Sequence, residues 1–164
     1  MGIVLVRVDD RLVHGQIIEA WVPFCRATAI IVANDEAAGS RIQKMAIESC
    51  ASKSVSIKVE TIKDAAGDII SPRMENENVI VIVSNLRDIV RLHSWGIKFS
   101  SVNIGNIHHN GERHGIEYMK LSPSIFIDRD DWGFIIRFRE EGMKLDIRTV
   151  PMDNPVNIDR WKDK

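Results

Sequence analysis

Short, almost wholly apolar runs alternate along this chain with longer segments in which apolar residues recur every three or four positions. The short runs are rich in Val and Ile and are typical of β-strands covered on both faces, and the longer segments are typical of amphipathic helices. The predicted strands are Ile3–Val8, Ala29–Ala33, Ser56–Glu60, Val79–Val83, Ser101–Ile104, Ser124–Ile127 and Leu145–Val150, and the predicted helices are Gln16–Phe24, Glu36–Ala51, Ile62–Ile70, Leu86–Ser94 and Asp130–Glu141.

Residues that begin and end helices fall between these runs. Asn34 and Asp35 are good residues for the start of a helix, and Gly96 and Gly142 for its end. Regular alternation of strand and helix with short links predicts an α/β fold: an open, mostly parallel sheet of about six to seven strands with helices on both faces. No repeat or break in composition divides the chain, so we expect one domain over residues 1–164.

Composition and charge narrow the class of protein. A formal net charge of −1 argues against a nucleic-acid-binding protein, which normally carries a clustered basic surplus. Cys25 and Cys50 lack the spacing of metal ligands and are expected to be reduced thiols. The first residues do not resemble a signal peptide, and no run approaches the ~20 apolar residues that cross a bilayer. We therefore expect a cytoplasmic protein.

The most informative segment is 9–16, Asp-Asp-Arg-Leu-Val-His-Gly-Gln, which directly follows the first predicted strand. It places His14 in the turn between that strand and the first helix. In open α/β sheets this turn lies at the carboxyl edge, where ligands usually bind. A neutral imidazole is a good nucleophile, and its ordinary pKa near ~6.5 leaves much of it neutral in the cytosol. His14 is therefore a candidate phosphoryl acceptor.

The neighbours of His14 are those that a phosphoryl group needs. Arg11 offers a cation that can bind two oxygens, and the helix start at Gly15 and Gln16 offers backbone N–H groups. Asp9 or Asp10 could hold the second ring nitrogen and fix the tautomer. Spacing alone does not establish this function, because a histidine in such a turn is more often a surface or capping residue.

The sequence of the whole segment 9–16, together with the residues around it, points to a more specific function. It resembles the signature of the mannose/fructose/sorbose-type IIB subunits of the bacterial sugar phosphotransferase system. The resemblance continues in order over nearly the entire chain, and the segments that carry it are Val6–Gln16, Trp21-Val22, Ile31–Asp35, Val102–Ile107 and Glu141–Pro151.

The resemblance implies a phosphocarrier. His14 would accept a phosphoryl group, at Nδ1, from the phosphohistidine of a IIA domain and pass it to a sugar entering through the IIC and IID membrane subunits. Arg11 would stabilise the phosphate, and Asp9 or Asp10 would be the acidic member of the loop. The resemblance implies no cofactor and docking on the inner membrane through partner subunits. It leaves open a homodimer and the identity of the sugar.

Two polar positions elsewhere have alternative interpretations. Ser84 follows the fourth predicted strand and could offer its hydroxyl to the phosphate if the first and fourth strands are neighbours, or it could cap the next helix. The stretch Asn106–Lys120 is predicted as a long loop near the active edge or a partner surface. Its candidate ligands lack a helical i, i+4 pair, so we expect no metal site there; they are His108, His109, Glu112 and His114.

Two other functions compete with the phosphocarrier. One is a signalling protein phosphorylated on the same His14 that reports its state to a binding partner without sugar transport. The other is a small nucleotide-binding α/β module. The second is disfavoured because neither Gly-x-Gly-x-x-Gly nor Gly-x-x-x-x-Gly-Lys follows the first strand.

Overall fold

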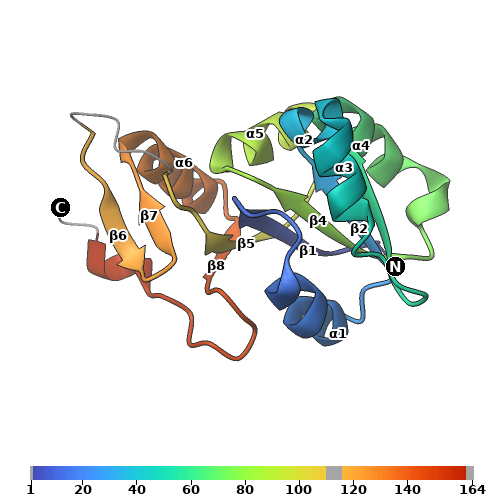
Figure 1. Ribbon diagram of the computed structural model, residues 1–164. Helices are drawn as coiled ribbons and strands as arrows, with labels where there is room; N and C mark the ends of the chain where they lie inside the picture. The colour runs from blue at the N-terminus through green and yellow to red at the C-terminus, as the bar shows by residue number, and fades with distance from the viewer. Residues whose placement is uncertain (1, 110–115, 162–164) are drawn as a thin grey trace.

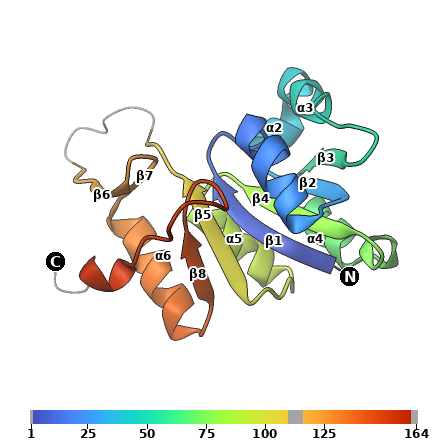
Figure 2. The ribbon, with the colours of Figure 1, turned by 90° about the horizontal axis from the view of Figure 1, so that it is seen from below.

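A parallel sheet forms the centre of the computed structural model, which describes residues 2–109 and 116–161. The strand order is β3-β2-β4-β1-β5-β8, and every neighbouring pair is parallel. Figures 1 and 2 show β1 in the middle of this sheet, between β4 and β5. The strands are β1 (Gly2–Asp9), β2 (Ala29–Ala33), β3 (Ser56–Glu60), β4 (Asn78–Val83), β5 (Ser101–Asn106) and β8 (Lys144–Ile147).

Helices cover both faces of the sheet, as the alternation along β4 demonstrates. Val79, Val81 and Val83 belong to one buried cluster, and Ile80 and Ile82 belong to the other. The first cluster packs under α4 (Ile62–Ile70), α5 (Leu86–Ser94) and α6 (Arg129–Glu140). The second packs under the π-helical turn η1 (Ile17–Trp21), α1 (Val22–Cys25), α2 (Asp35–Gly39) and α3 (Arg41–Glu48). The predicted α/β fold is confirmed.

One predicted strand lies outside this sheet. β7 (Ile125–Ile127) pairs antiparallel with β6 (Met119–Ser122) in a separate hairpin, next to α6 in Figure 1. β6 falls partly inside the stretch predicted as a loop, because its residues carry little apolar periodicity. Among the described residues, a β-bridge between Ile107 and Ile125 joins the hairpin to the end of β5. The main sheet therefore has six strands, the lower end of the expected range.

One predicted helix is displaced by a single residue, since Asp130–Glu141 is Arg129–Glu140 in the structure, and two others differ in their internal form. The predicted helix Glu36–Ala51 divides into α2 and α3 at Ser40, whose side chain accepts a hydrogen bond from the Gln43 amide and begins α3. The predicted first helix starts with a π-helical turn and passes through Pro23. Pro23 lies in the first turn of α1, where its missing N–H costs no intrahelical hydrogen bond.

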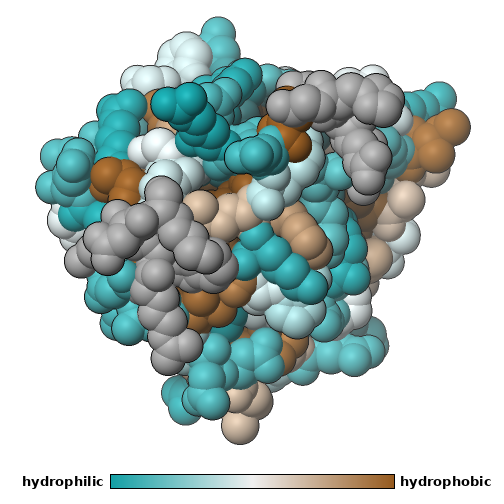
Figure 3. Space-filling model, turned by 90° about the vertical axis from the view of Figure 1, so that its left-hand side faces the viewer, coloured by the Kyte–Doolittle hydropathy of each residue, from teal (hydrophilic) through white to brown (hydrophobic). Residues whose placement is uncertain are grey.

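The remaining elements are short 3-10 turns, η2 (Pro72–Met74) and η3 (Ile158–Trp161). Among the described residues, no helix has the length and apolar character needed to cross a membrane. Cys25 and Cys50 are both free thiols, in agreement with the sequence. The face that carries β6, β7 and α6 is mainly hydrophilic where it is described, with hydrophobic residues in several small separate areas (Figure 3).

Candidate functional site

The alternation of β1 and its register with β5 assemble the inner part of the candidate site. Val6 and Val8 point into the cluster under α4–α6, so Arg7 and Asp9 point to the opposite face, toward η1. The register places Arg7 opposite Asn103, and after a shift it places Asp9 opposite Asn106. Facing residues on neighbouring strands lie about 5 Å apart, so the pairing of the two strands alone brings these polar side chains together.

Arg7 is fully buried beneath η1. Its Nε and Nη2 donate to Asp9 Oδ2 over 3.1 and 2.9 Å, and its Nη1 donates to Asn103 Oδ1. Its guanidinium carbon lies 5.2 Å from the centre of the Trp21 ring. A Cβ atom on Gly105 would lie 1.9 Å from that guanidinium carbon, so only glycine leaves room for the arginine at this position.

Asp9 is also fully buried, and it is the common acceptor of the site. Its Oδ2 accepts from Arg7, from Asn106 Nδ2 at 2.9 Å and from His14 Nε2 at 2.8 Å. Its Oδ1 accepts from the Arg11 amide at 3.1 Å. Burial alone would raise the pKa of Asp9, but the hydrogen bond from His14, the charge of Arg7 and the Asn106 amide outweigh it and hold that pKa below its ordinary value.

His14 lies at the surface end of this network, with 16% of its side chain exposed. An ionised carboxylate only accepts hydrogen bonds, so the contact with Asp9 places the ring proton on Nε2. The lone pair is then on Nδ1. Of the two acidic candidates, Asp9 contacts the ring of His14, whereas Asp10 contacts the His108 amide.

Arg11 and Gln16 form the exposed part of the site. Arg11 Nη2 lies 3.3 Å from His14 Nε2 and donates to Gln16 Oε1 at 2.7 Å. Arg11 does not pair with the Asp9 side chain, because Arg7 occupies that position. Leu12, between these residues, adopts the left-handed conformation with φ of 57°, a strained conformation for a non-glycine residue. An added Cβ at Gly15 would meet nothing within 4 Å, so the chain borders open space there.

Two predicted site residues point elsewhere. Asp10 Oδ2 accepts a hydrogen bond from the His108 amide. This bond links the turn after β1 to the segment after β5, and Asp10 is not hydrogen-bonded to His14. β4 is the neighbour of β1, as the interpretation of Ser84 required. The Ser84 hydroxyl accepts from Asn34 Nδ2 and Asn85 Nδ2 at 2.9 and 3.0 Å, and Asn85, not Ser84, caps α5.

A second histidine–carboxylate pair lies further along the same edge of the sheet. His109 Nε2 is 2.9 Å from Asp131 Oδ2, and its ring stacks on Tyr118 with the centroids 4.6 Å apart. Asp128 lies close enough to His109 and Asp131 for the three side chains to hold a metal ion, but Asp128 and Asp131 also form the capping box of α6. Burial raises the pKa of Asp131 above its ordinary value. The pair borders a polar cavity of about 620 Å³ that also contacts Arg87, Arg91 and Phe134. Two residues of the predicted ligand set, Glu112 and His114, lie outside the described residues.

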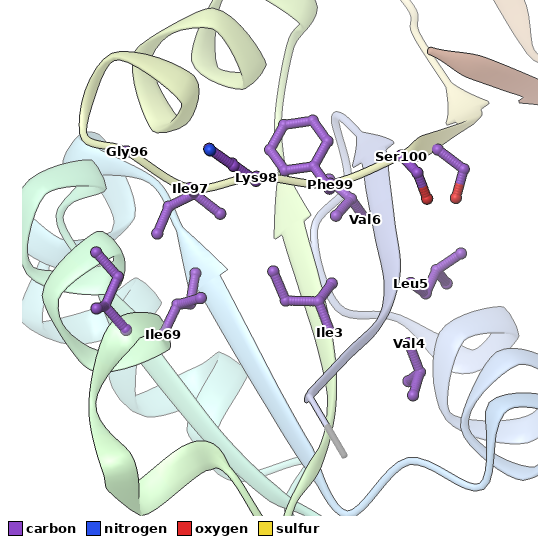
Figure 4. A pocket seen from close by; sticks show the side chains of 12 residues that line it. Ile3, Val4, Leu5, Val6, Ile69, Gly96, Ile97, Lys98, Phe99 and Ser100 are labelled. Carbon is purple, nitrogen blue, oxygen red and sulfur yellow. The ribbon is translucent and has the colours of Figure 1, made fainter. Parts of the chain in front are cut away.

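Another cavity, of about 700 Å³, lies at the opposite edge of the sheet. Figure 4 shows Ile3 from the start of β1 and Ile97 from the segment before β5 in this cavity, with Lys98 and Phe99 on the same segment as Ile97. Its lining combines aliphatic side chains with Lys98, Ser100 and Ser101, and it contains neither a histidine nor a carboxylate among the described residues. The candidate chemistry is therefore confined to the carboxyl edge around His14.

Fold and site together define a class: an α/β protein whose histidine, at the carboxyl edge of a parallel sheet, is held by a buried carboxylate. The chain belongs to the family of PTS system sorbose subfamily IIB components, whose model matches residues 3–164. It is thus a sugar-specific IIB component of a phosphotransferase system, a transferase component in sugar transport. The resemblance inferred from the sequence is confirmed.

Individual relatives agree with this assignment. The fructose-specific EIIB component of Bacillus subtilis (strain 168) is 31% identical over 153 residues, which are 93% of this chain and 91% of that protein. The mannose-specific EIIAB component of Escherichia coli (strain K12) is 29% identical over 93% of this chain and 46% of that protein. The crystal structure of the IIB domain of the sorbose permease from Klebsiella pneumoniae matches with a TM-score of 0.87 at 27% identity, covering 100% of this chain and 98% of that one.

The sequence analysis gave no role to four residues of the inner site: Arg7, Asn103, Gly105 and Asn106. One signal was available, because Arg7 and Asn103 are polar residues inside strands whose other positions are apolar. A polar side chain in a strand buried on both faces needs a partner. The sequence cannot say which partner, because that depends on the register of β1 with β5.

Proposed function

We propose that this chain is a phosphocarrier in which His14 accepts a phosphoryl group from the phosphohistidine of a IIA domain and passes it to a sugar entering through IIC and IID. The observation that carries this proposal is the contact between His14 Nε2 and the buried Asp9, which leaves the lone pair on Nδ1. In each transfer, a bond from Nδ1 to phosphorus forms or breaks, and the phosphoryl group moves between the two partners.

Asp9 contributes more than orientation in this mechanism. When Nδ1 attacks phosphorus, the bond to the donor nitrogen breaks and the ring of His14 becomes positively charged. The carboxylate at 2.8 Å stabilises that charge. In the second transfer the sugar hydroxyl attacks phosphorus and releases its proton to water, the Nδ1–P bond breaks, and the ring returns to its neutral form with its proton on Nε2.

The charge on the phosphoryl oxygens is matched by the exposed part of the site. Arg11 is the nearest cation, and it reaches the ring while bound to Gln16. The helix that begins at Gly15 supplies N–H groups without intrahelical acceptors and the positive end of its dipole. The Ser84 hydroxyl is held by Asn34 and Asn85, so we assign it no part in this charge stabilisation. The transfer step therefore rests on positioning and charge.

The partners are proposed from the relatives. The mannose-specific relative carries the designation EIIAB, which supports a phosphodonor of the IIA type. Transport of a sugar then requires membrane subunits of the IIC and IID type, on which the chain would dock from the cytoplasmic side. No nucleotide is needed, because the phosphoryl group arrives on another protein.

The test is a two-stage transfer. With phosphorylated IIA, the chain should gain one acid-labile phosphoryl group, and heteronuclear NMR of a ¹⁵N-histidine sample should place it on Nδ1 of His14. Membrane vesicles holding IIC and IID, together with the sugar, should then discharge it. A stable label in the presence of vesicles and sugar would favour the signalling function, and no label on His14 would overturn the phosphocarrier.

A further inference from the structure

We infer that Arg7 is a positioning residue whose buried charge keeps His14 in its neutral, nucleophilic form. This inference rests on the proposed function of His14. Arg7 touches neither His14 nor the space in front of it, so it acts through Asp9.

One carboxylate oxygen of Asp9 contacts both His14 and Arg7. Asp9 Oδ2 accepts from His14 Nε2 at 2.8 Å and from Arg7 Nη2 at 2.9 Å. A buried carboxylate without a cation would take its positive partner from the imidazole, because an opposite charge at this distance favours the imidazolium. An imidazolium carries protons on both nitrogens and cannot attack phosphorus. Arg7 supplies the positive charge permanently, so the ring can stay neutral while Asp9 stays ionised.

The surroundings of Arg7 hold it in this position. Asn103 accepts from Nη1, Trp21 lies against the guanidinium, and the missing side chain of Gly105 provides its space. Trp21 is itself fixed by a hydrogen bond from Nε1 to the Thr149 carbonyl at 2.9 Å. Such a fixed guanidinium differs from Arg11, whose exposed side chain is free to follow the phosphoryl group.

Other charged groups surround the site and bear on the same balance. Arg11 approaches His14 from the loop, and Asp10 is engaged by His108 from the segment after β5. Asp146 and Arg148, at the end of β8, pair with each other at 2.9 Å. Among these groups Arg7 is the one that binds the same Asp9 oxygen as His14.

The experiment removes the charge of Arg7, of Asp9 or of both, and follows the titration of His14 by NMR. In Arg7→Met, the His14 ring resonances should titrate about 1 to 3 pH units higher than in wild type, because Asp9 loses its cation. The pH at which the phosphorylation rate falls on the acid side of its pH profile should move by the same amount. Asp9→Asn leaves Arg7 uncompensated and should move the titration in the opposite direction. The double variant Arg7→Met/Asp9→Asn carries neither charge and should return it close to wild type.

Controls separate this role from packing. Ile31→Ala removes buried volume from β2 without changing charge, and the titration of His14 should stay in place. Arg7→Lys keeps the charge and should restore most of the pH profile. If Arg7→Met does not fold, the comparison of Asp9→Asn with the double variant Arg7→Met/Asp9→Asn, which buries no unpaired charge, still measures the effect of the cation.

The outcomes distinguish the two proposals. Unchanged titration of His14 in Arg7→Met or an equal shift in Ile31→Ala would overturn the role of Arg7, whatever the protein phosphorylates. If Arg7→Met shifts the His14 titration as expected but the wild-type protein takes no phosphoryl group, the phosphocarrier is overturned and the electrostatic role of Arg7 stands.

Discussion

His14 and His109 each contact an aspartate through Nε2, at 2.8 and 2.9 Å, but the two carboxylates respond in opposite ways. Asp9 has a lowered pKa and Asp131 a raised one, and burial opposes ionisation in both. At Asp9 the hydrogen bond from His14, the charge of the buried Arg7 and the Asn106 amide together outweigh burial, whereas at Asp131 burial and the charge of the neighbouring carboxylate, Asp128, prevail. The other groups bound to each aspartate therefore determine whether its carboxylate is stabilised in the ionised form.

A second difference lies in what each histidine can offer to a ligand. His14 stands beside Arg11 and the start of a helix, at the end of a strand in the middle of the sheet. His109 is stacked on Tyr118 and joined to the capping box of α6. Among the described residues, no arginine is hydrogen-bonded to His109 or Asp131. The His14–Asp9 pair therefore has neighbours that can bind an anion. The His109–Asp131 pair instead connects the segment after β5, the hairpin and α6.

The largest expected effect separates the two histidines by substitution. His14→Ala should abolish phosphorylation by IIA, because no nucleophile remains at the site. His109→Ala should still be labelled at close to the wild-type rate. Labelling is measured as acid-labile phosphate on the intact protein. Persistent labelling of His14→Ala would show that the phosphoryl group is carried elsewhere.

The two aspartates should differ in stability when each loses its charge. Asp9→Asn leaves Arg7 buried without a counter-charge and should lower the free energy of unfolding by about 3 to 5 kcal/mol at pH 7. Asp131→Asn keeps an acceptor for the Asp128 amide and removes a poorly solvated charge, so its effect should stay within about 1 kcal/mol. Urea unfolding measures both.

The pH dependence of these effects follows from the directions of the two pKa shifts. The lowered pKa of Asp9 contributes stability that is present above its ordinary value of 3.8 and is lost as the pH falls through the folded value below it. For Asp131, the raised pKa contributes stability that is present below 3.8 and is lost as the pH rises through its folded value. Equal pH profiles for the two Asn variants would contradict this difference.

Substitutions of Arg11 test whether this side chain stabilises the anion beside the His14–Asp9 pair. Arg11→Ala should slow phosphorylation of His14 about 10²-fold, the scale seen when one charge-stabilising donor is lost. Its exposed position should leave the stability nearly unchanged. Arg11→Lys should recover part of the rate, because it restores the charge without the two-pronged geometry. Lys98→Ala, at the opposite edge of the sheet, is the matched control; equal slowing there would assign the effect to general surface charge.

The smallest expected effect concerns the space that Arg7 needs. Gly105→Ala puts a methyl group against the guanidinium and should destabilise the protein by about 1 to 3 kcal/mol while weakening phosphorylation. Gly67→Ala, in α4 with nothing within 4 Å of its new methyl group, should instead stabilise by up to about 1 kcal/mol. Thermal unfolding of the two variants should therefore move in opposite directions.

Local signals were sufficient for most elements of the fold. Ala29–Ala33, Ser56–Glu60, Ile62–Ile70 and Leu86–Ser94 have the predicted bounds, because their apolar pattern and the residues that end them act within a few positions. The hairpin of β6 and β7 was missed because β6 has no comparable pattern and is defined by its partner strand. The division at Ser40 depended on one capping side chain.

The sequence by itself determined that a histidine stands at the carboxyl edge of a parallel sheet with an arginine, a helix start and two acids nearby. Only the tertiary structure decided that Asp9 rather than Asp10 holds the ring, that Arg7 compensates it, and that Gly105 makes room for Arg7. The physical reason is that these contacts join β1 to β5, about 100 positions apart in the sequence. Their pairing depends on strand register, which the whole sheet sets and no short segment encodes.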